Sequence, residues 1–154
     1  MTLTLTNGFV PWSVVDLQMR AARTIWLATV RPDDRAHAVP VWFVWRAPAV
    51  YTMSRRDLQK AVNLRHQSWA VAHLGDGDDT IILEGPATVV SDAAEVDAVD
   101  RAWSAKYVDP GTGTHDTVRV PDADVWRIDP AHVMTWAYGD VTSRTDWRLT
   151  ETSA

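Results

Sequence analysis

The sequence predicts a mainly β domain with peripheral helices, in which antiparallel strands form a closed or split barrel. Its apolar stretches are short and rich in β-branched and aromatic residues, which is typical of strands. Short turns containing Asp, Pro and Gly separate these stretches, as in an antiparallel meander. About six such strands with few helices are best accommodated by a barrel, because closing the sheet leaves the fewest free edges.

The N-terminal half is expected to begin with a mixed, extended segment over residues 1–12. Ser13 is expected to cap a helix that ends near Arg23. Three strands follow at residues 24–30, 36–46 and 50–53, joined by turns at 31–35 and 47–48. Asp57 is then expected to cap a second helix that ends near His66.

The C-terminal half is expected to contain three further strand regions and one helix. A strand at 69–74 leads through a hairpin tip at 75–79 into a long strand over 80–83 and 87–90, kinked at Gly85 and Pro86. Asp92 and Glu95 have the spacing of a capping box for a helix that ends near Tyr107. A loop at 108–122 precedes a last hairpin or bent strand, whose two halves are residues 125–128 and 133–136, and a tail that ends in polar residues. No internal repeat separates a second domain, so residues 1–154 are interpreted as one domain.

Composition excludes several classes of protein. The net charge of -5 argues against a general nucleic-acid binder, because such domains are usually basic. There is no cysteine, which excludes disulfides, thiolate nucleophiles and Cys-ligated zinc. No apolar run is long enough to span a membrane, and the N-terminus lacks an export signal. We therefore expect a cytoplasmic protein that binds neither nucleic acid nor membrane.

The central strand region is apolar on both faces. Its alternation places Ala38, Pro40, Trp42 and Val44 on one face and Val39, Val41, Phe43 and Trp45 on the other. A barrel interior covers only one face, so a helix or a second protomer must cover the other, which favours a dimer. Pro40 removes a ladder donor and is tolerated mainly at an edge or bulge. The backbone there is free either to meet a ligand or simply to form a protected edge strand.

Polar and basic residues cluster after the next strand. Within nine residues around a helix start the chain carries Thr52, Ser54, Arg55, Arg56 and Lys60. Helix N-termini favour phosphate, and Lys60 in the first turn would add a positive charge. Asn63 lies one turn later on the same side. The pattern fits a phosphate site, and it also fits a solvated basic helix start.

Four segments in order resemble the pyridoxamine 5'-phosphate oxidase-like superfamily. They read WLATVRPD at 26–33, HAVPVWFVW at 37–45, KAVNLR at 60–65 and EGPA at 84–87. The resemblance is closer to its flavin or deazaflavin (coenzyme F420)-dependent oxidoreductases. It implies a split β-barrel of the FMN-binding type and a homodimer with two cofactor sites at the subunit interface.

The resemblance also implies a set of cofactor-binding residues. The backbone of Val39, Pro40, Val41 and Trp42 would lie along the flavin or deazaflavin ring, and Thr52, Ser54 and Lys60, supported by Asn63, would meet the phosphate and ribityl side. Gln59 stands where a basic residue is frequent. Arg55, Arg56 and Arg65 could serve the longer acidic tail of F420. Partner-chain aromatics would close the pocket, with Trp136, Tyr138 and Trp147 as candidates, or these residues pack in the core or at the interface.

These implications lead to one expected function and two alternatives. We expect an oxidoreductase that uses F420 or FMN on a small organic substrate, with F420 slightly preferred; no catalytic residue is assigned, because the cofactor performs hydride transfer. The alternatives are a non-catalytic flavin or F420 carrier or sensor, and a cofactor-free split-barrel dimer. The five histidines show no metal spacing. His37, at the start of the central strand, could touch a ligand or only form part of the barrel rim, and the rim is preferred. Asp76, Asp78 and Asp79 are interpreted as a turn, so no metal site is expected.

Overall fold

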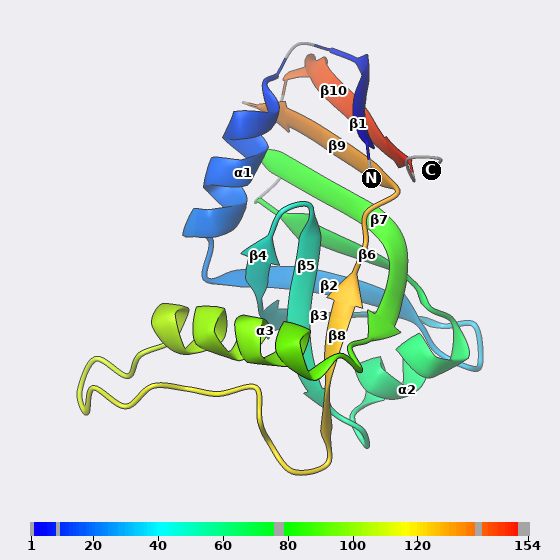
Figure 1. Ribbon diagram of the computed structural model, residues 1–154. Coiled ribbons are helices and arrows are strands. Elements are labelled where there is room, and N and C mark those ends of the chain that lie inside the picture. The colour runs from blue at the N-terminus through cyan, green and yellow to red at the C-terminus, as the bar shows by residue number, and fades with distance from the viewer. Residues whose placement is uncertain (1, 9, 76–78, 138–139, 151–154) are drawn as a thin grey trace.

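A computed structural model describes residues 2–8, 10–75, 79–137 and 140–150 (Figure 1). These residues form strands and helices in the order β1 (Thr2–Asn7), α1 (Trp12–Ala21), β2 (Thr24–Val30), β3 (Ala36–Trp42), β4 (Val44–Arg46), β5 (Ala49–Arg55), α2 (Gln59–His66), β6 (Trp69–Leu74), β7 (Thr80–Val89), α3 (Ala93–Lys106), β8 (Ala123–Ile128), β9 (His132–Ala137) and β10 (Asp140–Thr150). None of these helices is long and apolar enough to cross a membrane.

The strands form one antiparallel sheet that curls into a split barrel. Its main path runs β1-β10-β9-β7-β6-β2-β3, and a branch runs from β7 through β8 and β5 to β4. β7 joins the two parts, because residues 80–84 pair with β9 and residues 87–89 pair with β8. Figure 1 shows β7 curving as it passes between them. The two paths end at β3 and β4, so the barrel is split where these consecutive strands part.

Gly85 makes the change of partner on β7 possible. A Cβ at this position would lie 2.0 Å from the carbonyl oxygen of Asp129, in the link between β8 and β9. That link crosses β7 closely, with the amide of Asp129 donating to Pro86 (3.0 Å) and the amide of Ala131 donating to Glu84 (2.8 Å). The kink predicted at Gly85 and Pro86 is therefore the place where β7 leaves one half of the sheet for the other.

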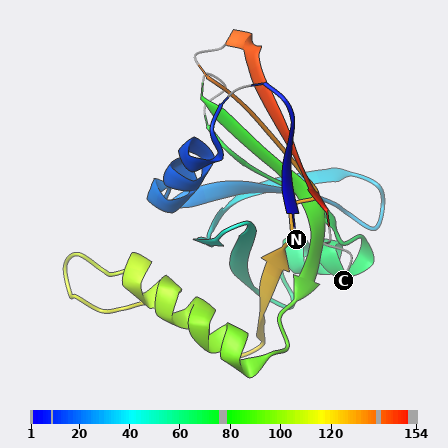
Figure 2. The same cartoon turned by 45° about the horizontal axis from the view of Figure 1, so that its top comes forward.

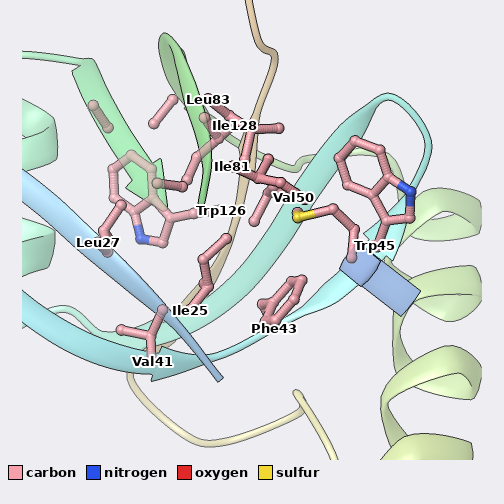
Figure 3. Close-up of a cluster of buried hydrophobic side chains, with 14 of the residues drawn as sticks. Ile25, Leu27, Val41, Phe43, Trp45, Val50, Ile81, Leu83, Trp126 and Ile128 are labelled. Atoms are coloured by element: carbon pink, nitrogen blue, oxygen red, sulfur yellow. The ribbon is translucent and has the colours of Figure 1, made fainter. Parts of the chain in front are cut away.

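Two apolar clusters hold the fold together. The larger fills the barrel, and Figure 3 labels Ile25, Leu27, Val41, Phe43, Trp45, Val50, Ile81, Leu83, Trp126 and Ile128 among its members. The smaller lies between α3 and β4–β5, where Val99, Trp103 and Tyr107 pack with Val44 and Tyr51. Figures 1 and 2 place α3 and the loop after it on the side of the molecule away from β1 and β10.

Several predicted elements are confirmed. The strands at 24–30 and 69–74 have the predicted bounds, and α1, α2 and α3 lie where helices were expected. Residues 108–122 form a loop without a helix or strand. The hairpin tip at 75–79 lies partly outside the described residues.

The predicted helix caps were partly wrong. Pro11 occupies the N-cap position of α1, and Ser13 is inside the helix. Leu58 occupies that position in α2, and the carboxylate of Asp57, one residue earlier, pairs with Arg55 (Nη2–Oδ2 2.9 Å). Asp92 does cap α3 by accepting from Ala94, but Glu95 does not complete the capping box. Its carboxylate instead accepts from Tyr51 and Arg127.

The predicted strand at 36–46 is interrupted, and two strands were missed. At Phe43 the backbone amide donates to the hydroxyl of Tyr107 (2.8 Å) instead of to a neighbouring strand, which separates β3 from β4. β1 and the long β10 pair with each other, and β10 also pairs with β9. β10 is mostly polar, so its pairing rather than its hydrophobic pattern defines it as a strand.

Candidate functional site

The predicted cofactor seat, which is the backbone of residues 39–42, lies on a strand with one free edge. β3 pairs with β2, with Pro40 opposite Trp26, and no other strand in the described part of the chain pairs with β3. Pro40 is thus on an edge strand, where a missing donor costs least. Val41 faces the barrel core, whereas Pro40 and Trp42 are exposed. The backbone of residues 39–42 is therefore accessible from outside the barrel, as a ring-binding strand requires.

Thr52 and Ser54, the two predicted cofactor residues on β5, lie beside this strand and are buried. Thr52 donates its Oγ1 hydrogen to the carbonyl of Trp42 (2.8 Å) and so ties β5 to the end of β3. The Oγ of Ser54 donates to the carbonyl of Arg55 (3.1 Å). Both hydroxyls have structural roles, and their predicted contact with a cofactor stays a prediction.

Three basic side chains converge at the other end of β3. Lys60 on α2 is half-buried, and burial lowers its pKa. Burial also lowers the pKa of His37 on β3, and the charges of Arg31 and Lys60 lower it further. His37 Nδ1 and Arg31 Nε are buried without a hydrogen-bond partner in the described residues. The lowered pKa favours the neutral His37 ring, so Arg31 and Lys60 are the two cations here, and together with the unused nitrogens they make a favourable place for an anion.

Arg31 and His37 were not among the predicted site residues. The sequence placed Arg31 in a turn, and it allowed His37 either a ligand contact or a place on the barrel rim, with the rim preferred. Their meeting with Lys60 depends on how α2 packs against β2, the strand that pairs with β3, which local sequence patterns do not encode. The one feature of the sequence that could have indicated this meeting is the short turn at 31–35, which brings Arg31 and His37 close to each other.

Asn63 supports the site from inside. It is fully buried, and its Nδ2 donates to Thr29 Oγ1 (2.9 Å) while its Oδ1 accepts from Gln59 Nε2 (2.7 Å). Gln59, which replaces a frequent basic residue, therefore holds Asn63. These bonds join α2 to β2 and fix the helix that carries Lys60.

The three arginines considered for an acidic cofactor tail form ion pairs within the chain. Arg55 pairs with Asp57 (2.9 Å), and both Arg56 (2.9 Å) and Arg65 pair with Asp124. The Arg55–Asp57 pair is exposed on both sides and contributes little, so an anionic ligand can compete for Arg55. Asp124 is mostly buried and holds Arg56 and Arg65 together.

The C-terminal aromatic residues divide between different environments. Trp147 is buried in its own barrel and meets Trp12 edge to face, with ring centroids 5.5 Å apart. Core packing, one of the two interpretations of this residue, is therefore what the structure shows. Trp136 is half-buried on β9, and Tyr138 lies outside the described residues.

The outer face of β2, β3 and β6 carries large exposed apolar side chains. Trp26 is 45 % exposed, Trp42 39 % and Trp69 48 %. Trp26 stacks on His73 (centroids 6.3 Å, planes 6° apart), which covers only part of it. This is the second apolar face expected from the sequence, and no element of the described chain covers these three tryptophans fully.

A pocket of about 460 Å³ adjoins the Trp42 end of the seat. It lies between β3, the end of α3 and the loop that follows, and its wall includes Arg23, Trp42, Tyr107 and His115. Of the predicted cofactor residues only Trp42 lines it. The seat itself is an open surface along β3, which a second protomer would have to close.

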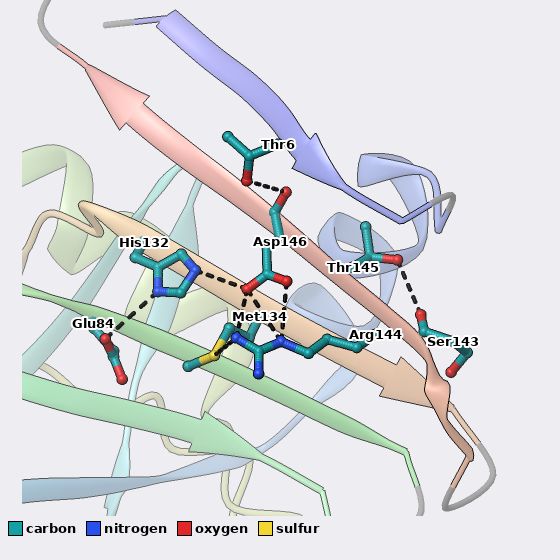
Figure 4. A network of polar contacts seen from close by, with 8 residues as sticks. All are labelled: Thr6, Glu84, His132, Met134, Ser143, Arg144, Thr145 and Asp146. Carbon is teal, nitrogen blue, oxygen red and sulfur yellow. Dashed lines mark hydrogen bonds and ion pairs between the residues drawn. The ribbon is translucent and has the colours of Figure 1, made fainter.

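A separate polar network lies on β7, β9 and β10 (Figure 4). His132 stands between Asp146 (Nε2–Oδ1 2.9 Å) and Glu84 (Nδ1–Oε2 3.6 Å), and Arg144 pairs with Asp146 (2.9 Å). Both ring nitrogens of His132 thus face carboxylates, which suits a structural clamp on β10. No group of three or more potential metal ligands occurs in the described part of the chain.

Comparison with known proteins gives a consistent result. The sequence model of the family described as pyridoxamine 5'-phosphate oxidase matches residues 14–137. A crystal structure of a conserved hypothetical protein from Mycobacterium tuberculosis is similar at a TM-score of 0.73, with 21 % identity over 97 % of this chain and 94 % of the other. No curated protein matched the sequence.

Two further solved structures show how varied proteins of this fold are. A pyridoxamine 5'-phosphate oxidase-related, FMN-binding protein from Nostoc punctiforme has a TM-score of 0.60 and 19 % identity over 90 % of each chain. The heme storage protein HutZ from Vibrio cholerae has a TM-score of 0.66 and 14 % identity over 82 % of this chain and 95 % of the other. At these identities the likeness shows the fold alone.

Proposed function

Because the chain belongs to the pyridoxamine 5'-phosphate oxidase family, we propose that it is an oxidoreductase that uses FMN or F420 on a small organic substrate, with the cofactor held between two protomers. The basic cluster of Arg31, His37 and Lys60 is the observation that carries this proposal. It lies at one end of the free edge of β3 and offers unused nitrogens to a phosphate. The FMN-binding relative from Nostoc punctiforme supports a flavin in this fold.

Different residues of the chain would contact different parts of the cofactor. The exposed backbone of residues 39–42 would lie along the ring, the basic cluster would hold the phosphate side, and Thr52 and Ser54 on β5 would meet the ribityl side. The bound flavin or deazaflavin would supply the hydride-transfer chemistry. The protein would supply position and exclude water, which needs no catalytic acid or base among these residues.

The second protomer would cover the exposed tryptophans. Replacing Trp26 by Glu puts a charge on the outer face of β2 and should shift the protein toward monomer in light scattering after gel filtration. Leu17→Glu is a matched control, because Leu17 is 69 % exposed on α1, away from this face. A wild-type protein that stays monomeric, with or without FMN, would contradict the dimer.

The direct test of the function is a titration of purified protein with FMN, F420 and riboflavin, followed by fluorescence. We expect a preference for a phosphate-bearing cofactor over riboflavin. Reduction of the bound cofactor followed by addition of menadione then separates an enzyme from a carrier, because only an enzyme accelerates reoxidation above the rate for free cofactor. If neither FMN nor F420 binds, the cofactor-free split-barrel dimer is the alternative that remains.

A further inference from the structure

The pocket at the Trp42 end of β3 has the composition of a binding site for a flat ring. Trp42 and Tyr107 stack with centroids 4.5 Å apart and planes 5° from parallel. Tyr107 is fixed there, because its hydroxyl accepts from the Phe43 amide (2.8 Å) and lies 2.7 Å from the carbonyl oxygen of Arg23. Trp42 is 39 % exposed and forms part of the pocket wall. The pocket therefore has a rigid aromatic wall of the kind that planar ligands stack on.

Arg23 adds a positive charge beside this wall. Its Cζ lies 5.4 Å from the centroid of Trp42 and 5.6 Å from that of Tyr107. Because these distances are nearly equal and the two rings are parallel, the guanidinium lies beside the stacked pair rather than on the outer face of either ring. No hydrogen bond or ion pair engages the Arg23 side chain in the described residues. Its donors are free for an oxygen anion at the edge of a ligand ring.

The other polar groups of the pocket are largely used by the loop after α3. Asp109 Oδ1 accepts from the amides of Gly111 and Thr112 (both 2.8 Å), and these bonds lower its pKa. Asp116 Oδ1 accepts from the amide of Thr117 (2.8 Å). The two carboxylates therefore shape the loop, and Arg23 is the cation left to recognise charge on a ligand.

His115 has one ring nitrogen in use and one free. Its Nδ1 lies 2.7 Å from the carbonyl oxygen of Ser104, which can only accept, so Nδ1 carries the hydrogen. In the neutral ring Nε2 is then an acceptor on the loop side of the pocket. This nitrogen suits a hydroxyl or ring N–H of a ligand rather than its carboxylate.

We propose that this pocket binds the substrate, and that the substrate is a flat conjugated ring compound bearing a carboxylate. The ring would lie against Trp42 and the carboxylate on Arg23. The assignment of this pocket as the substrate site rests on the proposed function, in which Trp42 belongs both to the pocket and to the cofactor seat. Its volume of about 460 Å³ is in the range of small-molecule sites.

The test is isothermal titration of 2-naphthoate and its neutral analogue 2-naphthamide into the FMN-loaded and cofactor-free protein. We expect wild type to bind naphthoate more tightly than naphthamide. Arg23→Gln should weaken naphthoate binding about tenfold or more and leave naphthamide binding nearly unchanged, because a charge-assisted hydrogen bond is lost. Arg101→Gln is the matched control, since Arg101 is an exposed arginine on α3 that does not line the pocket.

A second variant tests the location. Thr114→Trp adds a large ring to the pocket wall and should abolish naphthoate binding while the FMN affinity stays at the wild-type value. Equal affinity for naphthoate and naphthamide, or an unchanged affinity in Arg23→Gln or Thr114→Trp, overturns the pocket assignment. Failure of both FMN and F420 to bind overturns the proposed function instead, and the titration of the cofactor-free protein still decides the pocket.

Discussion

Replacing Lys60 by Ala should weaken FMN binding by about 10- to 150-fold. Lys60 is half-buried, and burial lowers its pKa because the ammonium has lost water. No carboxylate in the described residues forms a salt bridge with it. A hydrogen bond to a charged group contributes about 1.5–3 kcal/mol, and about 1.4 kcal/mol corresponds to a factor of ten in Kd. A phosphate at this position would gain that much from Lys60.

The assay compares FMN with riboflavin, which lacks the phosphate. Flavin fluorescence is followed during titration of wild type, Lys60→Ala and the surface control Arg101→Ala. We expect the Lys60 variant to lose affinity for FMN and to keep its affinity for riboflavin. Its thermal midpoint should stay at or above the wild-type value, because a partly desolvated charge is removed. Equal losses for both flavins, or no loss for FMN, would refute the phosphate assignment.

Three other predictions concern stability and pH. Gly85→Ala should destabilise the fold by about 3 kcal/mol or more, measured by urea unfolding, because the new Cβ would meet the Asp129 carbonyl oxygen at 2.0 Å. Tyr107→Phe should cost about 1–3 kcal/mol, because the Phe43 amide loses its acceptor. His37 has a lowered pKa, so the unfolded chain takes up a proton at higher pH than the folded chain. Wild-type stability should therefore fall as pH drops below about 6.5, and His37→Gln should show a shallower fall.

The first two of these predictions have matched controls. Gly111→Ala should change stability little, because the nearest atom to the new Cβ is the flexible carboxylate of Asp109 at 3.3 Å. Tyr51→Phe removes a hydroxyl that bonds a partly exposed Glu95, so it should cost less than Tyr107→Phe. Equal costs for the two members of either pair would contradict the reasoning. For His37, a wild-type urea midpoint that is the same at pH 7.5 and 5.5 would do so.

The sequence was sufficient for elements with a strong local pattern. β2 and β6 are apolar and bounded by polar residues, and α3 carries Val99, Trp103 and Tyr107 at helical spacing, so their positions were predictable. β10 was missed because its residues are mostly polar and become a strand only by pairing with β1 and β9.

The site was predictable only in part, for a related reason. The helix start after β5 and the proline-bearing edge strand have local signals, and these led to residues 39–42 and Lys60. The meeting of Arg31 and His37 with Lys60, and of Arg23 with Trp42 and Tyr107, joins residues far apart in the sequence. Such contacts follow from strand register and helix packing, which a single sequence does not specify.

The split between β3 and β4 links the cofactor seat to the proposed dimer. A barrel closed through β3 would need no partner, but this chain leaves β3 with a free edge and keeps tryptophans exposed on the adjacent outer face. Leaving large apolar side chains in water costs free energy that their burial would recover. A protomer that covered this face would also close the open side of the seat. Cofactor binding and dimerisation would then stabilise each other, since a ligand bound only by the dimer shifts the equilibrium toward it.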